Sequence, residues 1–217
     1  MKLFVDTGSI KDIETLAALG ILDGVTTNPS LLAKEAGDYR QNLKRICEIV
    51  NGPVSGEVTA TDFAGMIRQG HDIAAIDERM VVKVPLTRDG IRACKALSTE
   101  GTRVNVTLVF SAAQALLAAK AGATFVSPFV GRLDDVATNG MELIREIVDI
   151  YDNYAFATEV LVASCRHPIH VVEAARMGAD IATCPPAVID QLFNHPLTTI
   201  GLEKFLKDWE KAQAVKA

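Results

Sequence analysis

The sequence predicts an α/β protein, a single (β/α)8 TIM barrel with an extra helix at its C-terminus. Short apolar runs alternate with longer amphipathic ones along the whole chain, which is typical of parallel strands joined by crossover helices. Eight such units of even length fit into about 195 residues, near the small end of the range for this barrel. A doubly wound sheet is the competing fold, but it rarely needs eight even units, and no G-x-G-x-x-G follows the first apolar run.

The first half of the chain supplies four of the expected strands, over residues 3–5, 24–26, 54–59 and 81–85. Ser9 is a suitable N-cap for a helix near 9–19, and Pro29 suits the first turn of a helix after the second strand. Residues 37–50 predict a further helix between strands two and three, because Ile46, Ile49 and Val50 recur at helical spacing.

The second half repeats the pattern, with strands expected over 104–109, 124–128, 155–163 and 180–184. Ser111 opens an alanine-rich helix, and further helices are expected near 134–151, 168–177 and 186–193. We therefore expect one domain over residues 1–217, with the barrel in about 1–194 and a helical extension in about 195–217.

The extension is predicted to be helical from His195 to about Gln213. It has no barrel strand to cover, so its apolar stripe must pack elsewhere, either as a cap on the barrel or on a neighbouring subunit. The stripe consists of Leu202, Phe205, Leu206 and Trp209.

Composition excludes several classes of function. With 217 residues, 49% hydrophobic, 23% charged and a net charge of −5, the chain is neither disordered nor fibrous. Its lysines and arginines are scattered, so no basic stripe indicates a nucleic-acid or anionic-membrane partner. No run approaches the roughly 20 apolar residues of a spanning helix, and Asp6 comes too early for a signal peptide, which predicts a cytoplasmic protein.

The four cysteines lie far apart without any C-x-x-C pair, which favours reduced, buried thiols over disulfides or a zinc site. They are Cys47, Cys94, Cys165 and Cys184.

Lys83 lies in the middle of the apolar run 79–86. A buried ammonium is costly unless it is paired or deprotonated, so Lys83 is either a member of a structural ion pair or a reactive amine. Alternation along the strand turns Val82 and Val84 toward the helices and Lys83 toward the barrel axis.

The same alternation sends polar groups from other strands to the same mouth, where active sites of this fold collect. Glu57 faces inward with Ser55 and Thr59, whereas Asn105 and Thr107 face inward between Val104, Val106 and Leu108, which face the helices. The remaining candidates are Asp6 beside Phe4, Asn28 beside Thr26, Arg132 after strand six, and Ser164 and Arg166 after strand seven.

An interior hydrogen-bond network accounts for Ser55, Thr59 and Thr26. It accounts less well for a lysine, two acids and two arginines directed at one pocket. That set suits an amine nucleophile, proton-transfer groups and an anion clamp.

Two other motifs carry less weight. The tetrapeptide at 6–9 matches aspartic proteases, but their chemistry needs two such carboxylates and the sequence has one copy. His167 and His170 have an i, i+3 spacing that metal sites use, but Pro168 begins a helix there and no third ligand is evident. We expect surface or capping roles for both histidines, and no metal.

The chain resembles small, single-domain transaldolases nearly from end to end. Three segments carry the resemblance: Gly24-Val-Thr-Thr-Asn-Pro-Ser30, Val81-Val-Lys-Val-Pro85 and Ser127-Pro-Phe-Val-Gly-Arg-Leu-Asp134. It implies a cofactor-free class I mechanism in which Lys83 forms a Schiff base with the C2 carbonyl of a ketose phosphate, fructose 6-phosphate or sedoheptulose 7-phosphate, and passes a dihydroxyacetone unit to an aldose phosphate.

The resemblance also implies roles for the other candidates. Asp6 and Glu57 would handle protons, and Asn28, Asn105 and Thr107 would orient the lysine, the catalytic water and the substrate hydroxyls. Arg132, Ser164 and Arg166 would hold the phosphate. Members of the family often form two stacked five-membered rings, so a homo-oligomer, up to a decamer, is expected.

Two alternatives remain. Fructose-6-phosphate aldolases are similar through most of the chain, but they typically have glutamine and tyrosine where this sequence has Glu57 and Phe129. A phenol there could protonate the carbanion and release free dihydroxyacetone, which a phenyl ring cannot do. The second alternative is a phosphosugar-binding barrel that does not turn its ligand over. The presence of Lys83 together with Asp6 and Glu57 argues against it.

Overall fold

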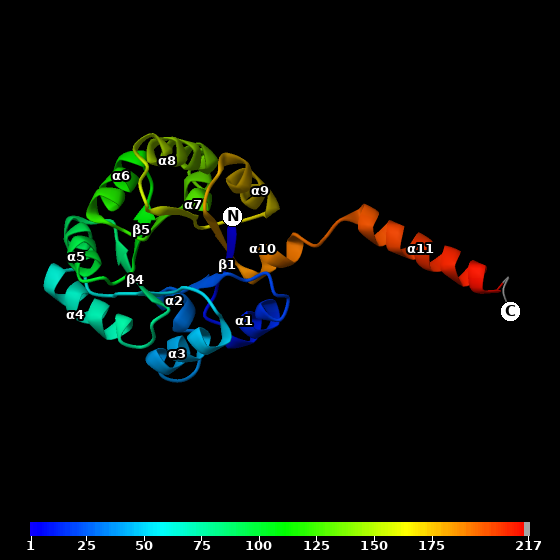
Figure 1. The fold of residues 1–217 in the computed structure, drawn as a ribbon, viewed down its shortest axis with the longest axis horizontal. Coiled ribbons are helices and arrows are strands. Elements are labelled where there is room, and N and C mark those ends of the chain that lie inside the picture. The colour runs from blue at the N-terminus through cyan, green and yellow to red at the C-terminus, as the bar shows by residue number, and fades with distance from the viewer. Residues whose placement is uncertain (215–217) are drawn as a thin grey trace.

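The computed structural model describes residues 1–214, and the predicted barrel is confirmed. Eight parallel strands close on themselves in sequence order, so that β1 pairs with both β2 and β8. Helices form a ring around the strands, and the last helix projects away from that ring (Figure 1). The strands are β1 Lys2–Asp6, β2 Gly24–Thr26, β3 Val54–Glu57, β4 Met80–Pro85, β5 Val104–Val109, β6 Phe125–Pro128, β7 Glu159–Val162 and β8 Ile181–Cys184.

Most helices follow their strands where the sequence predicts them. Ser9 caps α1 by accepting a hydrogen bond from the backbone N–H of Asp12, as expected from the sequence. The helices are α1 Ile10–Ala17, α2 Pro29–Leu32, α3 Tyr39–Ile49, α4 Phe63–Ala74, α5 Arg88–Thr99, α6 Ala112–Ala121, α7 Val130–Asp134, α8 Gly140–Tyr154, α9 Pro168–Met177, α10 Pro186–Gln191 and α11 Pro196–Ala214.

The helix expected near 134–151 is two helices. The short α7 begins at Val130, directly after β6, and α8 begins at Gly140, where Asn139 acts as N-cap. The break places Arg132 on a helix of its own at the end of β6. The seventh strand is also shorter than predicted, since it begins at Glu159.

The barrel has two separate apolar cores. Val82, Val84, Val104 and Val106 belong to the larger one, between strands and helices, as their alternation predicts. A smaller cluster fills the barrel axis and consists of Phe4, Val81, Phe125, Leu161, Ala163 and Ile181. Lys83 follows Val81 by two residues and therefore lies on the same inward face, above this dry layer.

The prediction for Leu108 is wrong. The β5–β6 register shifts between Val106 and Val109, and Leu108 takes a left-handed backbone conformation with φ 59°. This irregularity turns its side chain away from the helices and leaves it 42% exposed. A period-two pattern cannot anticipate a bulge, because the bulge breaks the period.

Thr59 is also misplaced by the sequence pattern. Strand β3 ends at Glu57, and Thr59 lies in the exposed loop beyond it. There its backbone N–H donates to Gln69 Oε1 at 2.8 Å, and its hydroxyl accepts from Gln69 Nε2 at 3.1 Å. Thr59 is therefore not part of the interior network.

The helix α11 is formed over the predicted residues, but it does not cap the barrel. None of its described residues is buried, and Phe205 and Trp209 are 71% and 64% exposed. Figure 1 shows this helix extending away from the ring. Residues 215–217 of the predicted extension lie outside the described part of the chain.

Among residues 1–214, no helix is both long and apolar enough to cross a membrane. All four cysteines are buried and free, as the sequence analysis expected. No group of three or more potential metal-ligating side chains occurs within the same described residues.

Candidate active site

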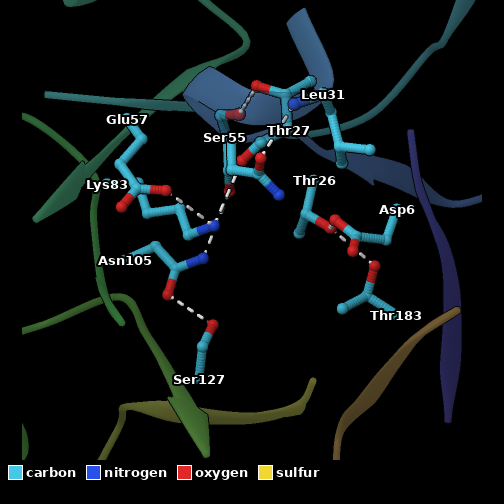
Figure 2. Close-up of polar contacts among 11 residues, drawn as sticks. Asp6, Thr26, Thr27, Leu31, Ser55, Glu57, Lys83, Asn105, Ser127 and Thr183 are labelled. Atoms are coloured by element: carbon cyan, nitrogen blue, oxygen red, sulfur yellow. Dashed lines mark hydrogen bonds and ion pairs between the residues drawn. The ribbon is translucent and has the colours of Figure 1, made fainter. Parts of the chain in front are cut away.

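Lys83 is the buried cation of the barrel interior. Its residue is 5% exposed, and its Nζ lies 3.1 Å from Glu57 Oε2 and donates to the carbonyl oxygen of Thr27 at 3.1 Å. Figure 2 shows the amine between these two groups. Strand register explains the pairing, because Glu57 of β3 lies directly opposite Lys83 of β4.

Asn105 is held next to the lysine by two serines. The register places Asn105 of β5 opposite Lys83, and its Nδ2 donates to Ser55 Oγ at 3.3 Å. Ser127 Oγ donates to Asn105 Oδ1 at 2.7 Å. Both functional atoms of the amide are thus occupied, which fixes the orientation of Asn105 beside the amine (Figure 2).

Thr107 follows Asn105 on the same inward face and is fully buried. Among the described residues, its Oγ1 is the buried side-chain oxygen that has no hydrogen-bond partner. A buried hydroxyl without a partner is costly, so this atom is suited to binding a water molecule.

Asp6 lies on the other side of the barrel axis. Its Oδ1 accepts a hydrogen bond from Thr26 Oγ1 at 2.7 Å, and that hydroxyl in turn lies 2.7 Å from Thr183 Oγ1 (Figure 2). Burial raises the pKa of the Asp6 carboxyl, while the charge of Lys83 and the hydrogen bond from Thr26 oppose the rise. A carboxylate whose pKa is raised is a better proton acceptor than an ordinary aspartate.

A cavity of about 340 Å³ at the carboxyl ends of the strands joins Asp6 and Lys83 to the side of the mouth that carries the arginines. Most of the predicted site residues line it, namely Asp6, Asn28, Lys83, Phe129, Arg132, Ser164 and Arg166. Glu57 contacts Lys83 but lines a neighbouring hollow, and Asn105 and Thr107 are not among the residues that line this cavity.

Two further residues shape this cavity. Asn28 lies at the end of β2 and caps the short helix α2, where its Oδ1 accepts from the backbone N–H of Leu31 at 2.9 Å. Phe129 follows β6 and packs edge-on against Phe110, with ring centroids 5.8 Å apart. Its phenyl ring presents no proton donor to the cavity.

Arg132 and Arg166 form the cationic side of the cavity, and both are exposed. Arg132 lies on α7 and has no ion-pair partner within residues 1–214, whereas Arg166 Nη2 contacts Asp135 Oδ2 at 2.8 Å. Between them Ser164 takes a left-handed backbone conformation, φ 61°, which costs about 1 kcal/mol for a residue other than glycine.

The expected surface or capping role of His170 is wrong. Its side chain is buried at the start of α9 and contacts Asp134 Oδ2 through Nε2 at 2.9 Å, and Nδ1 accepts from the backbone N–H of Arg166 at 3.2 Å. His167, by contrast, is exposed and makes no side-chain cap contact. The i, i+3 spacing gave both histidines the same expected role, because it does not show which of them packs against α7.

Ser127 and Thr183 are site residues that the sequence analysis did not select. Applying the alternation to β6 and β8 would have found both, because each follows an inward apolar residue, Phe125 and Ile181, by two positions. The carbonyl of Thr27, which accepts from Lys83, has no such signal, since any residue has a carbonyl.

The thiol of Cys165 also lines the cavity. A hydrogen bond with Cys184, burial and neighbouring negative charge hold the pKa of Cys165 well above its usual range. Because the thiolate is the reactive form of cysteine, this raised pKa makes Cys165 an unreactive part of the cavity wall.

A larger hollow of about 590 Å³ lies on the outer side of Glu57, bordered by α2, the start of α3 and α4. Its polar lining includes Tyr39, Arg40 and Asp72 but not Lys83. The convergent groups therefore place the chemistry in the smaller cavity.

The chain matches known proteins over nearly its whole length. The family model described as transaldolase/fructose-6-phosphate aldolase matches residues 3–216. A probable transaldolase of Chlorobium limicola is 61% identical over 216 residues, covering 96% of this chain and 97% of the relative. Probable transaldolases of Anaeromyxobacter sp. strain K and Methanococcus maripaludis are 60% and 58% identical, each over 97% of this chain and 97% and 98% of the relative.

Among solved structures, a designed, cube-shaped protein cage built by fusing symmetric oligomeric domains matches with a TM-score of 0.64. It is 12% identical in sequence and covers 100% of this chain and 80% of that one, so it shows the fold alone. The family match and the curated relatives span nearly the whole length of the chain. The chain therefore belongs to the transaldolase/fructose-6-phosphate aldolase family.

Proposed function

We propose that the protein is a transaldolase that moves a dihydroxyacetone unit from a ketose phosphate, such as fructose 6-phosphate or sedoheptulose 7-phosphate, to an aldose phosphate. The observation that carries the proposal is the buried amine of Lys83, paired with Glu57 and open to a cavity whose far side carries two arginines. Family membership and the names of the curated relatives support the same activity.

The reaction begins with a proton transfer. Attack on a carbonyl requires the neutral amine, and Glu57 Oε2, at 3.1 Å from Nζ, is placed to take the proton. The amine then adds to the C2 carbonyl carbon of the ketose. One proton of the added amine passes to the C2 oxygen to give a carbinolamine, and return of the proton from Glu57 to that hydroxyl releases it as water and leaves an iminium on Lys83.

Cleavage of the C3–C4 bond needs a base that removes the proton of the C4 hydroxyl. Asp6 fits that role, because burial raises its pKa and so makes it a better proton acceptor. It removes the proton of the C4 hydroxyl, the C3–C4 electron pair flows into the iminium, and an aldose phosphate leaves. The retained enamine then attacks the aldehyde of an acceptor by the reverse of these steps.

Asn105 and Thr107 of β5 suit the steps that take place at the lysine. The amide of Asn105 is fixed by Ser55 and Ser127 next to the amine, and the unpartnered hydroxyl of Thr107 suits a reacting water molecule. Asn28 suits a substrate hydroxyl on the other side. Arg132, Ser164 and Arg166 suit the phosphate, because guanidinium groups bind phosphate oxygens with paired, charge-assisted hydrogen bonds.

Borohydride trapping tests the mechanism. Incubation with fructose 6-phosphate and borohydride should add the reduced dihydroxyacetone or hexose phosphate unit to Lys83, which peptide mass spectrometry locates. An adduct on another residue, or none, would reject the proposal. Binding of the ketose phosphate without any adduct or turnover would instead support a non-catalytic phosphosugar-binding barrel.

A coupled assay with and without erythrose 4-phosphate separates the transaldolase from the aldolase. Phe129 in the cavity has no hydroxyl that could protonate the enamine, so the retained unit should wait for an acceptor. Turnover should therefore depend on erythrose 4-phosphate. Substantial release of free dihydroxyacetone without the acceptor would favour the aldolase.

We also propose that the protein is a homo-oligomer, as five-membered rings or a decamer of two such rings. Helix α11 exposes a row of large apolar side chains that no part of the described chain covers, which includes Leu202, Phe205, Leu206 and Trp209. Light scattering should give a mass well above 23.3 kDa, and Trp209→Ala should lower it. A monomeric mass for the unaltered protein would contradict this assembly.

The four buried, free thiols support a reducing compartment, and we propose the cytoplasm as the location.

A further inference from the structure

The two arginines of the cavity belong to different segments that meet above β6 and β7. Arg132 lies on α7, and Arg166 lies in the loop between β7 and α9. The backbone N–H of Gly131 donates to the carbonyl of Ser164 at 3.1 Å. A Cβ at Gly131 would lie 2.3 Å from that carbonyl oxygen, so the two segments touch as closely as a glycine allows.

His170 contacts both of these segments. Its Nδ1 accepts from the backbone N–H of Arg166 at 3.2 Å, and its Nε2 lies 2.9 Å from Asp134 Oδ2 at the end of α7. Asp134 is held in turn, because its Oδ1 accepts from the backbone N–H of Gly140 at 2.9 Å. The imidazole is 4% exposed and therefore has little freedom to move.

The contacts define the protonation state. Because Nδ1 accepts a hydrogen bond, the ring proton lies on Nε2, which donates to Asp134. Burial and the neighbouring His167 lower the pKa of His170, while Asp134 and Glu173 oppose that change. A doubly protonated ring would lose the contact with the backbone of Arg166.

We propose that His170, in its neutral form, is a positioning residue for the anion site: it ties the backbone of Arg166 to Asp134 and so holds Arg166 and Arg132 at the spacing that a substrate phosphate requires. This inference rests on the proposed function, which supplies the phosphate, but nothing in that function uses His170. The imidazole itself does not reach the cavity, since it is not among the residues that line it. It acts through the two arginines.

Two substitutions separate the two contacts. In His170→Asn the amide oxygen can replace Nδ1 as the acceptor for Arg166, but the reach to Asp134 is lost. In His170→Gln the longer amide can replace Nε2 and donate to Asp134, but the acceptor for Arg166 is lost. His71→Asn is the matched control, because this exposed histidine of α4 also pairs its Nε2 with a carboxylate, that of Glu100, but makes neither contact and does not line the cavity.

Steady-state kinetics with fructose 6-phosphate and borohydride adduct formation with dihydroxyacetone provide the readout. We expect both His170 variants to raise KM for fructose 6-phosphate by about tenfold, the effect of one misplaced hydrogen-bonding group, with kcat nearly unchanged. Adduct formation with unphosphorylated dihydroxyacetone should not change, and His71→Asn should behave as the unaltered enzyme. An unchanged KM for fructose 6-phosphate in both His170 variants would overturn the proposal. An equal loss of activity with fructose 6-phosphate and of adduct formation with dihydroxyacetone would also overturn it.

A second measurement keeps the test independent of turnover and of a folding defect. Asp134→Ala removes the carboxylate that contacts Nε2 of His170, and this carboxylate is partly exposed. Calorimetry with inorganic phosphate as the probe should show about tenfold weaker binding to this variant. If the unaltered protein binds phosphate but forms no adduct on Lys83, the proposed function fails while this comparison still tests His170. Equal phosphate affinity in Asp134→Ala and the unaltered protein would overturn the inference.

Discussion

The lysine side of the cavity and the arginine side are held in place by different parts of the barrel. Glu57, Lys83 and Asn105 lie on neighbouring strands, in register, and are hydrogen-bonded within the barrel interior. Arg132 and Arg166 lie beyond the strands, on a short helix and a loop, and are exposed. In the proposed mechanism, the groups whose charge changes thus lie on strands, and the groups that stay charged face water.

The difference follows from the two tasks. A nucleophilic amine works when it has given up its proton, and the register of the sheet places Glu57 beside Lys83 to accept it. Arginine stays protonated in any environment and must meet a hydrated phosphate, so a solvent-facing position costs it nothing. We expect substitutions on the lysine side to affect turnover and those on the arginine side to affect substrate affinity.

Removal of the nucleophile should have the largest effect. Lys83→Met should lower turnover by about 10⁴-fold or more and abolish the borohydride adduct, because no other cavity group can form the iminium. The measurement is kcat in the coupled assay, with circular dichroism as the control for folding, since the substitution leaves Glu57 without its ion-pair partner. Retained turnover in a folded variant would contradict the role of Lys83.

Asp6→Asn should lower kcat by about 10²- to 10⁴-fold, the usual contribution of a general base, and leave KM for the ketose phosphate nearly unchanged. It should also stabilise the protein at pH 7. The folded-state pKa of Asp6 is raised above 3.8, so ionisation of this carboxyl destabilises the folded protein as pH rises through that raised pKa. Asparagine avoids this cost and can still accept from Thr26.

Thermal unfolding at several pH values measures the stability effect. The gain in Tm of Asp6→Asn should be present at pH 7, shrink as pH falls through the raised pKa, and vanish below 3.8, where the carboxyl is protonated in both folded and unfolded states. Thr26→Val offers a comparison, because it removes the hydrogen bond that opposes the rise in the pKa of Asp6. A lower Tm for Asp6→Asn at pH 7 would show that burial does not dominate at this carboxyl.

On the arginine side, Arg132→Ala should raise KM for fructose 6-phosphate more than Arg166→Ala does. Arg132 has no ion-pair partner among residues 1–214, whereas Arg166 must exchange Asp135 for the phosphate. Loss of one charge-assisted contact corresponds to about 10- to 100-fold in affinity. Equal effects of the two substitutions would contradict the expected ranking of the arginines. A fall in kcat without a change in KM would contradict the assignment of this side to substrate affinity.

The smallest expected effect lies where the two sides meet. Phe129→Tyr should leave total turnover within about tenfold and shift part of it from transfer to release of free dihydroxyacetone, because the new phenol can protonate the enamine. The ratio of products with and without erythrose 4-phosphate measures the shift. Phe110→Tyr is the matched control, since Phe110 packs against Phe129 but does not line the cavity.

The sequence predicted the lysine side better than the arginine side. Lys83 and Asn105 follow from strict alternation along buried strands, because a period of two leaves each side chain one choice of face. Ser127 and Thr183 obey the same rule and were recoverable by it. Glu57 was placed correctly for the same reason, although its strand ends there and the pattern fails two residues later, at Thr59.

What the sequence by itself determined is the number of strands, the inward phase of Lys83 and the identity of the two arginines that follow strands six and seven. Those features depend on local periodicity. The exposed Leu108, the burial of His170 and the course of α11 were decided by the tertiary structure. Each depends on which distant segment a residue meets, or on a break in the period, and a repeat along one strand or helix does not encode either.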